Sequence, residues 1–193
     1  MIKIETADFI KSAAKREQYP ALQVREFAFF GRSNAGKSSL INMLVNRKSL
    51  VKTGSRPGMT RLINFFLINK SFCLADLPGY GYAQRSAAEQ AAFDLMLAEY
   101  ARFREELKTV FFLIDMRRLP GEVERQSVEY FENLGIEVVI VGTKADKLGA
   151  NEVRNVQKKW SAFFNRSADL IPATSATKKN GRDAILRMIA ERV

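Results

Sequence analysis

The sequence predicts an α/β fold in which helices cover both faces of a mainly parallel β-sheet. Segments typical of strands alternate with segments typical of helices, and several strand segments are apolar throughout, as in a sheet that is buried on both faces. A glycine-rich loop over residues 31–38 also joins the first such strand to the first such helix. We expect one domain over residues 1–193, on which residues 1–21 pack as an N-terminal extension.

The individual elements follow from hydrophobic spacing and from turn residues. Runs rich in β-branched and aromatic residues predict strands over 22–30, 62–68, 72–75, 109–114, 137–141 and 170–172. Apolar residues at helical spacing, such as Phe93, Met96 and Tyr100, predict helices. These helices span 37–45, 87–107, 122–134, 151–164 and 181–189. The stretch 46–61 shows no clear element.

The composition excludes several classes of chemistry. One cysteine, Cys73, forms no internal disulfide and no cysteine-based zinc site, and the lack of histidine excludes a His base or His metal ligand. There is no apolar run of 18 residues, and the charged N-terminus differs from a signal peptide, so we expect a cytoplasmic chain that does not bind membranes. The absence of coiled-coil heptads favours a monomer.

Positive charge is concentrated in one part of the chain. Lys and Arg total 31 against 21 acids, for a net charge of +10, and residues 31–80 hold eight basic residues and one acid. Such an asymmetry favours a polyanionic partner such as nucleic acid, because basic side chains that neutralise phosphates release counterions. A solvated basic face without a specific partner is the alternative.

The loop over 31–38 matches the pattern G-x-x-x-x-G-K-[ST], which binds phosphates. Its backbone N–H groups and the following helix N-terminus can face phosphate oxygens. Lys37 would reach the β- and γ-phosphates, and the Ser38 hydroxyl would bind Mg²⁺. The residues of the loop are Gly31, Arg32, Ser33, Asn34, Ala35, Gly36, Lys37 and Ser38.

Two further motifs follow in the order that a nucleotide site requires. Asp76 ends an apolar strand and would hold Mg²⁺, and Gly79 would let its N–H approach the γ-phosphate. In Thr143-Lys144-Ala145-Asp146, the Asp146 carboxylate could accept from N1–H and N2–H₂ of guanine, an edge that adenine lacks. Alone, these motifs are also typical of a strand-end turn and of a helix cap.

Two more interactions would complete the base site. The stem of Lys144 would cover the face of the base, and the backbone N–H of Ala176, in the pair Ser175-Ala176, could donate to guanine O6. The Ser175-Ala176 prediction rests on position alone.

These motifs resemble a Ras-like, translation-factor-class GTPase, and more closely the EngB (YihA/YsxC) family of bacterial ribosome-assembly GTPases. The resemblance rests on GRSNAGKSSLIN (31–42), PGMTRLINFF (57–66), DLPGYGYA (76–83) and TKADKL (143–148), and it covers nearly the whole chain. It implies a three-layer P-loop GTPase fold whose six-stranded, mainly parallel sheet has one antiparallel strand. It also implies a role in large-subunit assembly, linked to cell division and septation.

The resemblance also assigns residues that spacing alone does not. Thr60 is implied to close onto Mg²⁺ and the γ-phosphate, and Lys37, Thr60 and Gly79 would act in catalysis. Met59 and Arg61 stand where the family usually has Arg and Gln. Nucleotide-binding residues expected on this basis further include Ser39, Gly58, Met59, Arg61, Leu62, Leu77, Pro78 and Thr174.

The expected activity is slow GTP hydrolysis that a partner accelerates. Tyr80 occupies the position of the glutamine that positions water in Ras, and it cannot do the same. Related GTPases with Asn at the position of Asn34 bind K⁺ beside the phosphates, so K⁺ could take the place of an arginine finger here, unless Asn34 only hydrogen-bonds the loop. The expected partner is the large ribosomal subunit, or its precursor, through ribosomal RNA.

Two alternatives keep part of this interpretation. A P-loop ATPase or kinase would use Lys37, Ser38 and Asp76 but would give Asp146 no role. A basic RNA-binding module could bind nucleotide without significant hydrolysis. Discrimination between GTP and ATP separates the first, and nucleotide-dependent RNA binding separates the second.

Overall fold

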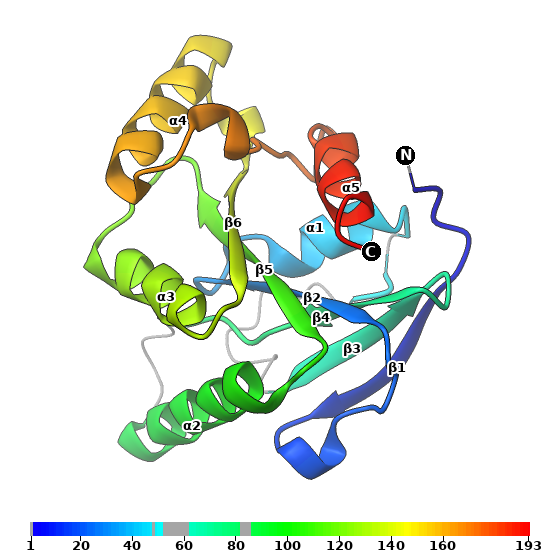
Figure 1. The fold of residues 1–193 in the computed structure, drawn as a ribbon. Coiled ribbons are helices and arrows are strands. Elements are labelled where there is room, and N and C mark those ends of the chain that lie inside the picture. The colour runs from blue at the N-terminus through cyan, green and yellow to red at the C-terminus, as the bar shows by residue number, and fades with distance from the viewer. Residues whose placement is uncertain (1, 48, 52–61, 82–85) are drawn as a thin grey trace.

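A six-stranded sheet runs through the middle of the molecule (Figure 1). The structure is a computed structural model that describes residues 2–47, 49–51, 62–81 and 86–193. The strand order across the sheet is β1-β3-β4-β2-β5-β6. The strands are β1 (Ala7–Ala13), β2 (Arg25–Gly31), β3 (Ile63–Ile68), β4 (Phe72–Asp76), β5 (Leu107–Asp115) and β6 (Glu137–Thr143).

One strand runs against the other five. β2 pairs in parallel with β4 and β5, and β5 pairs in parallel with β6. β3 is antiparallel to both of its neighbours, β1 and β4. The predicted mainly parallel sheet with one antiparallel strand is therefore confirmed. The four strands β4, β2, β5 and β6, which pair in parallel, point their carboxyl ends at one edge, where ligands bind in open α/β sheets.

Five α-helices form the two outer layers of the described structure. The alternation along β2 shows why the strands are apolar on both faces: Phe27 and Phe29 pack on one side, and Ala28 and Phe30 on the other. Helices α1 and α5 cover the first side, and α2, α3 and α4 cover the second (Figure 1). The helices are α1 (Lys37–Leu44), α2 (Ala87–Phe103), α3 (Glu122–Asn133), α4 (Ala150–Phe164) and α5 (Arg182–Ala190).

The predicted strand over 170–172 is wrong. The chain forms a 3-10 helix over Ala168–Leu170 and then a single parallel bridge between Ala173 and Gly142. Pro172 lacks an N–H, so it cannot donate to a ladder, and only its carbonyl bonds Gly142 N, at 2.9 Å. The segment is thus attached to β6 without becoming a strand.

The predicted helix over 87–107 is too long. α2 ends at Phe103, and β5 already begins at Leu107. Between them, Arg104 turns toward the buried Glu26, and its guanidinium donates to that carboxylate at 3.0 Å. A buried ion pair, rather than a turn residue, therefore accompanies the helix end.

The N-terminal residues contribute to the sheet itself. β1 is the edge strand, and four of its seven residues are exposed, so its sequence lacks the alternation that predicts a strand. Asn69 supports the approach to this strand, since its side chain accepts from Glu5 N (2.8 Å) and Thr6 N (3.0 Å) and donates to Lys3 O (2.7 Å). None of the described helices is both long and apolar enough to cross a bilayer.

Candidate functional site

The loop between β2 and α1 is shaped by glycine. A Cβ on Gly31 would lie 2.4 Å from Leu113 O, so only glycine lets β2 lie this close to β5 at the loop entrance. Gly36, the N-cap of α1, has a φ of +96°, in the left-handed region that favours glycine. The chain therefore turns sharply enough to present the N-terminus of α1 at the carboxyl edge of the sheet.

Lys37 folds back over this loop from the first position of α1. Its side chain is buried, and its Nζ donates to Gly31 O at 3.4 Å and to Arg32 O at 3.5 Å. The ammonium is thus held by the carbonyls of the loop that precedes it. This is the place that a phosphate-binding lysine requires.

Ser38 and Asp76 meet beside Lys37, as the sequence predicts for a magnesium site. Asp76 ends β4 opposite Phe29 of β2, and Ser38 Oγ donates to its Oδ2 at 3.0 Å. Its Oδ1 is buried and has no hydrogen-bond partner among the described residues. Burial raises the pKa of Asp76 to about 6, although Lys37 and Ser38 oppose this rise.

This donor set fits Mg²⁺. A hydroxyl and a carboxylate are hard oxygen ligands, and an unpartnered carboxylate oxygen is available to a cation or to its water. Within the described ranges no three His, Cys, Asp or Glu residues gather closely enough to hold a metal. A metal here would therefore take further ligands from hydroxyl groups, phosphate oxygens and water rather than from a carboxylate cluster.

The segment after Asp76 lies against the phosphate loop. Ser33 N donates to Tyr80 O at 2.8 Å, and a Cβ on Gly79 would lie 2.8 Å from both Ser33 N and Lys37 Nζ. Only a glycine at position 79 permits this approach. Leu77, in contrast, is a core residue.

Tyr80 directs its side chain away from the phosphate loop. Its ring packs on Phe30 and Phe112, with centroids 5.5 and 6.2 Å away, and its hydroxyl donates to Glu124 of α3 at 2.7 Å. Burial, followed by that bond to Glu124, raises the pKa of Tyr80 well above its usual value. The phenol is therefore neutral, and its hydroxyl is hydrogen-bonded to α3.

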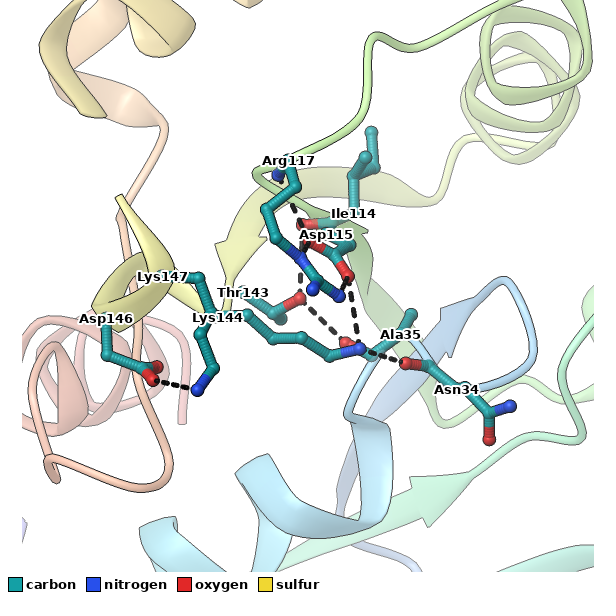
Figure 2. A network of polar contacts seen from close by, with 9 residues as sticks. All are labelled: Asn34, Ala35, Ile114, Asp115, Arg117, Thr143, Lys144, Asp146 and Lys147. Carbon is teal, nitrogen blue, oxygen red and sulfur yellow. Dashed lines mark hydrogen bonds and ion pairs between the residues drawn. The ribbon is translucent and has the colours of Figure 1, made fainter. Parts of the chain in front are cut away.

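The predicted base loop is tied to the phosphate loop (Figure 2). Thr143 ends β6, and its Oγ1 donates to Ala35 O at 2.7 Å. Lys144 follows in a left-handed conformation, with a φ of 58°, and its Nζ donates to Asn34 O at 2.8 Å. The two motifs are separated by more than 100 residues in the sequence and are in direct contact in the fold.

Asp146 and Ser175 lie together, although the Ser175-Ala176 pair was predicted on position alone. Ser175 Oγ donates to Asp146 Oδ1 at 2.6 Å, and this bond is the main cause that lowers the pKa of Asp146. Thr174 fixes the segment, since its N and Oγ1 donate to Gly142 O at 2.6 and 2.9 Å, and its carbonyl accepts from Ala145 N at 3.0 Å. The ionised carboxylate is thus oriented beside the end of β6.

A cavity of about 400 Å³ lies between α1 and the loop after Ser175. It brings the predicted residues Ser39 and Ala176 to one space, next to the phosphate loop and the base loop but lined by neither. Its lining comprises Ser39, Asn42, Met43, Asn46, Arg47, Ala176, Thr177 and Lys179.

Some predicted residues cannot be compared with the structure. Gly58, Met59, Thr60 and Arg61 lie outside the described residues, and so does most of the surrounding loop. Leu62 is described and partly exposed, directly before β3.

Sequence reasoning missed an ion network at the same edge of the sheet. Asp115 ends β5, and its carboxylate pairs with Arg117 at 2.7 Å and with Lys144 at 3.1 Å (Figure 2). The available signal was an acid at the end of an apolar strand, the same signal that identified Asp76.

Comparisons with known proteins agree on the family. The profile of a family described as "50S ribosome-binding GTPase" matches residues 26–144. A "Probable GTP-binding protein EngB" of Treponema denticola is 55% identical, with the full length of both chains covered. A protein of the same description from Clostridium perfringens is 44% identical over 96% of this chain and 94% of its own.

Solved structures share the fold. A crystal structure titled as a probable GTP-binding protein engB has a TM-score of 0.70 and 22% identity, and covers 86% of this chain and 97% of its own. The NFeoB protein of S. thermophilus, bound to GDP·AlF4⁻ and K⁺, has a TM-score of 0.59 and 26% identity, over 86% of this chain and 61% of its own. At one edge of the sheet, the phosphate loop meets the buried Asp76 carboxylate and the loop that carries Asp146. Together with these relatives, this arrangement shows that the chain belongs to the EngB family of GTP-binding proteins.

Proposed function

We propose that this chain hydrolyses GTP slowly and acts as a nucleotide-dependent switch in assembly of the large ribosomal subunit. The observation that carries the proposal is the convergence of Lys37, Asp76 and Asp146 on one sheet edge. Each side chain is held by a hydrogen bond: Lys37 donates to Gly31 O, Asp76 accepts from Ser38, and Asp146 accepts from Ser175. A P-loop ATPase or kinase would leave the oriented Asp146 unexplained, and membership of the EngB family favours GTP.

In this proposal the chain itself supplies most of the electrostatic stabilisation. Lys37 and the backbone N–H groups of the phosphate loop would bind the β- and γ-phosphates, and Ser38, Asp76 and Thr60 would hold Mg²⁺. Mg²⁺, when bound, neutralises charge on the phosphate oxygens. Asp146 would read the guanine edge, and the Ala176 N–H would serve as a donor to O6.

The proposed slow rate follows from Tyr80. Its hydroxyl is bonded to Glu124, and its ring is packed in the core, so no side chain of the Ras type stands after Gly79 to orient water. Lys48, Lys52, Arg56, Arg61 and Arg85 lie outside the described residues, and a partner or a cation is expected to complete the charge neutralisation.

K⁺ is the proposed cation, at Asn34. The S. thermophilus NFeoB structure contains K⁺ together with GDP·AlF4⁻, and in this chain Asn34 lies at the turn of the phosphate loop with a φ of 63°. We expect hydrolysis to be faster in KCl than in NaCl at equal ionic strength. Equal rates would remove K⁺ from the mechanism.

The proposed partner is ribosomal RNA of the large subunit or its precursor, bound by a monomer in the cytoplasm, with a link to cell division and septation. The family description and the net charge of +10 support this. Lys158, Lys159, Lys178 and Lys179 are exposed and available to phosphates. Arg182 also lies in this basic part of the chain, but it donates to Leu44 O at 2.8 Å at the end of α1.

Sedimentation with purified large subunits tests the switch. We expect the chain to pellet with them in the presence of a non-hydrolysable GTP analogue, less so with GDP, and with an affinity that falls steeply as salt rises. Lys37→Ala, which removes the phosphate contact, should bind equally weakly under both conditions. Binding of the wild-type chain that ignores the nucleotide would refute the switch and favour the simple RNA-binding alternative.

A further inference from the structure

The Asp115 carboxylate is a rigid acceptor at the edge where the nucleotide loops meet. It ends β5 in register with Thr143 of β6, and its side chain is only 6% exposed. Arg117 fixes both oxygens: its backbone N and Nε donate to Oδ1 at 3.1 and 3.0 Å, and its second terminal nitrogen donates to Oδ2 at 2.7 Å. The carboxylate therefore has one orientation.

Lys144 is held between this carboxylate and the phosphate loop. Its Nζ lies 3.1 Å from Asp115 Oδ2 and donates to Asn34 O at 2.8 Å (Figure 2). A lysine side chain is otherwise flexible, and ordering it costs conformational entropy. The ion pair with Asp115 and the hydrogen bond to the Asn34 carbonyl hold the stem of Lys144 in an extended position across the site.

Although burial opposes ionisation of Asp115, the hydrogen bonds from Arg117 and Lys144 hold its pKa below the usual range. The group therefore stays charged throughout the neutral pH range. Its charge balances the two cations around it, so the ammonium of Lys144 remains attracted to this point rather than to solvent.

We propose that Asp115, held by Arg117, is a positioning residue. It holds the side chain of Lys144 where its stem can cover the face of the guanine base. The proposal rests on guanine-nucleotide binding at this site. Preorganisation of this kind increases affinity, because the ordering cost is met before the ligand arrives. Asp115 acts through Lys144 and does not touch the base.

The proposal makes a distinctive prediction about base selectivity. The stem of Lys144 covers a face that guanine and hypoxanthine share, whereas Asp146 reads the N2 amino group that only guanine has. Loss of Asp115 should therefore raise the Kd for GDP and the Kd for IDP by the same factor and leave the ratio of the two Kd values unchanged. A disturbance that spread to Asp146 would change the ratio.

Calorimetric titration with GDP and IDP in the presence of Mg²⁺ tests this. We expect Asp115→Ala to raise both Kd values about ten-fold, since a charge-assisted hydrogen bond is lost. Asp115→Asn, whose amide oxygen still accepts from Lys144, should cost about three-fold, and it serves as the folded variant if the alanine variant is unstable. In a Lys144→Ala background, Asp115→Ala should add less than about two-fold, because the two residues act as a unit.

The matched control is Glu137→Gln. Glu137 begins β6, and Thr143 lies at the other end of the same strand. Glu137 accepts from Arg192 Nε at 2.7 Å, so the Gln variant loses a similar ion pair far from the site. Its Kd values should match those of the wild type. The proposal is overturned if Asp115→Ala and Asp115→Asn leave the GDP Kd within two-fold, or if Asp115→Ala costs the same with and without Lys144. Failure of the wild-type chain to bind GDP would instead overturn the proposed function.

Discussion

At the scale of single residues, Asp76 has a buried carboxylate with one oxygen that a cation could bind. Its Oδ2 accepts from Ser38, while Oδ1 is buried without a partner among the described residues. Burial of an incompletely paired carboxylate costs free energy, and a bound cation would remove that cost. Asp76 therefore links stability to pH, and it would link stability to any cation bound at this carboxylate.

The pKa of Asp76 predicts the sign of this linkage. Its folded value of about 6 lies above the unfolded value of about 3.9, so the folded protein binds more protons between them and loses stability as pH rises through this range. In protein stripped of nucleotide and metal, Asp76→Asn should raise the free energy of unfolding at pH 7.5 by up to about 3 kcal/mol and change it little near pH 4.

Urea denaturation at the two pH values measures the effect of Asp76→Asn. The matched control is Asp183→Asn, an exposed acid on α5, which should show no such dependence on pH. An equal effect of Asp76→Asn at pH 4 and pH 7.5 would contradict the assignment of a buried, ionised Asp76.

Asp146 predicts base selectivity. Its carboxylate is oriented by Ser175 and can accept from N1–H and N2–H₂ of guanine, whereas adenine has an unprotonated N1 and only a C–H at position 2. Asp146→Asn should weaken GDP binding about 100-fold and shift preference toward xanthosine diphosphate, which offers the complementary edge. Competition between the two nucleotides on one preparation measures this, and an unchanged GDP preference would remove Asp146 from base recognition.

At the scale of elements, the contact between the segment 76–80 and the phosphate loop depends on Gly79. An added Cβ would lie 2.8 Å from Ser33 N and Lys37 Nζ, so Gly79→Ala must displace one segment from the other. We expect GTP turnover to fall at least about ten-fold while the GDP Kd changes only a few-fold, because the displaced N–H serves the γ-phosphate.

Gly121→Ala is the control for that change, since its Cβ would meet nothing closer than Glu124 Oε2, at 3.5 Å. Single-turnover hydrolysis and calorimetry on both variants separate chemistry from binding. Unaltered turnover in Gly79→Ala would show that close packing at this position has no part in hydrolysis.

At the end of the sheet opposite the nucleotide loops, we expect the buried Glu26 to contribute to stability rather than to function. Glu26 of β2 is fully buried and accepts from Tyr100 Oη at 2.6 Å and from Arg104 at 3.0 Å, which joins α2 to the sheet. Glu26→Ala leaves the buried Arg104 without its main partner and should cost about 3–5 kcal/mol of unfolding free energy.

Glu106→Ala should cost less than about 1 kcal/mol, because Glu106 is more exposed and lies 3.4 Å from the same guanidinium. Denaturant titration of the two variants compares them, with the GDP Kd as a second measurement that neither should change. Equal costs would contradict the assignment of Glu26 as the main partner of Arg104.

The elements also show what the sequence could and could not predict. Continuous apolar runs predicted β5 and β6 because both faces of these strands are buried, and the helices followed from their stripes. β1 was not predicted as a strand, because main-chain pairing with β3 rather than burial of alternate side chains defines it. The failure at 170–172 has the opposite cause: the apolar residues are present, but Pro172 prevents a ladder.

At the scale of the molecule, the two hydrophobic cores formed by the described residues fix the sheet between helix layers and bring the loops together at one edge. Motif order predicted Lys37, Asp76 and Asp146 because phosphate, metal and base chemistry restrict residue type at fixed spacing. It could not predict that Asp115 and Lys144 pair, or that Tyr80 bonds Glu124, since those partners come from segments that only the fold brings together.

The central claim is that one site takes up guanine nucleotide through both its phosphates and its base. Calorimetric titration of the wild-type chain with GDP, GTP and ATP in the presence of Mg²⁺ tests it most directly. The account predicts micromolar or tighter Kd values for GDP and GTP and no measurable heat of binding for ATP. Uptake of ATP as tight as that of GTP, or no uptake of either guanine nucleotide, would contradict it.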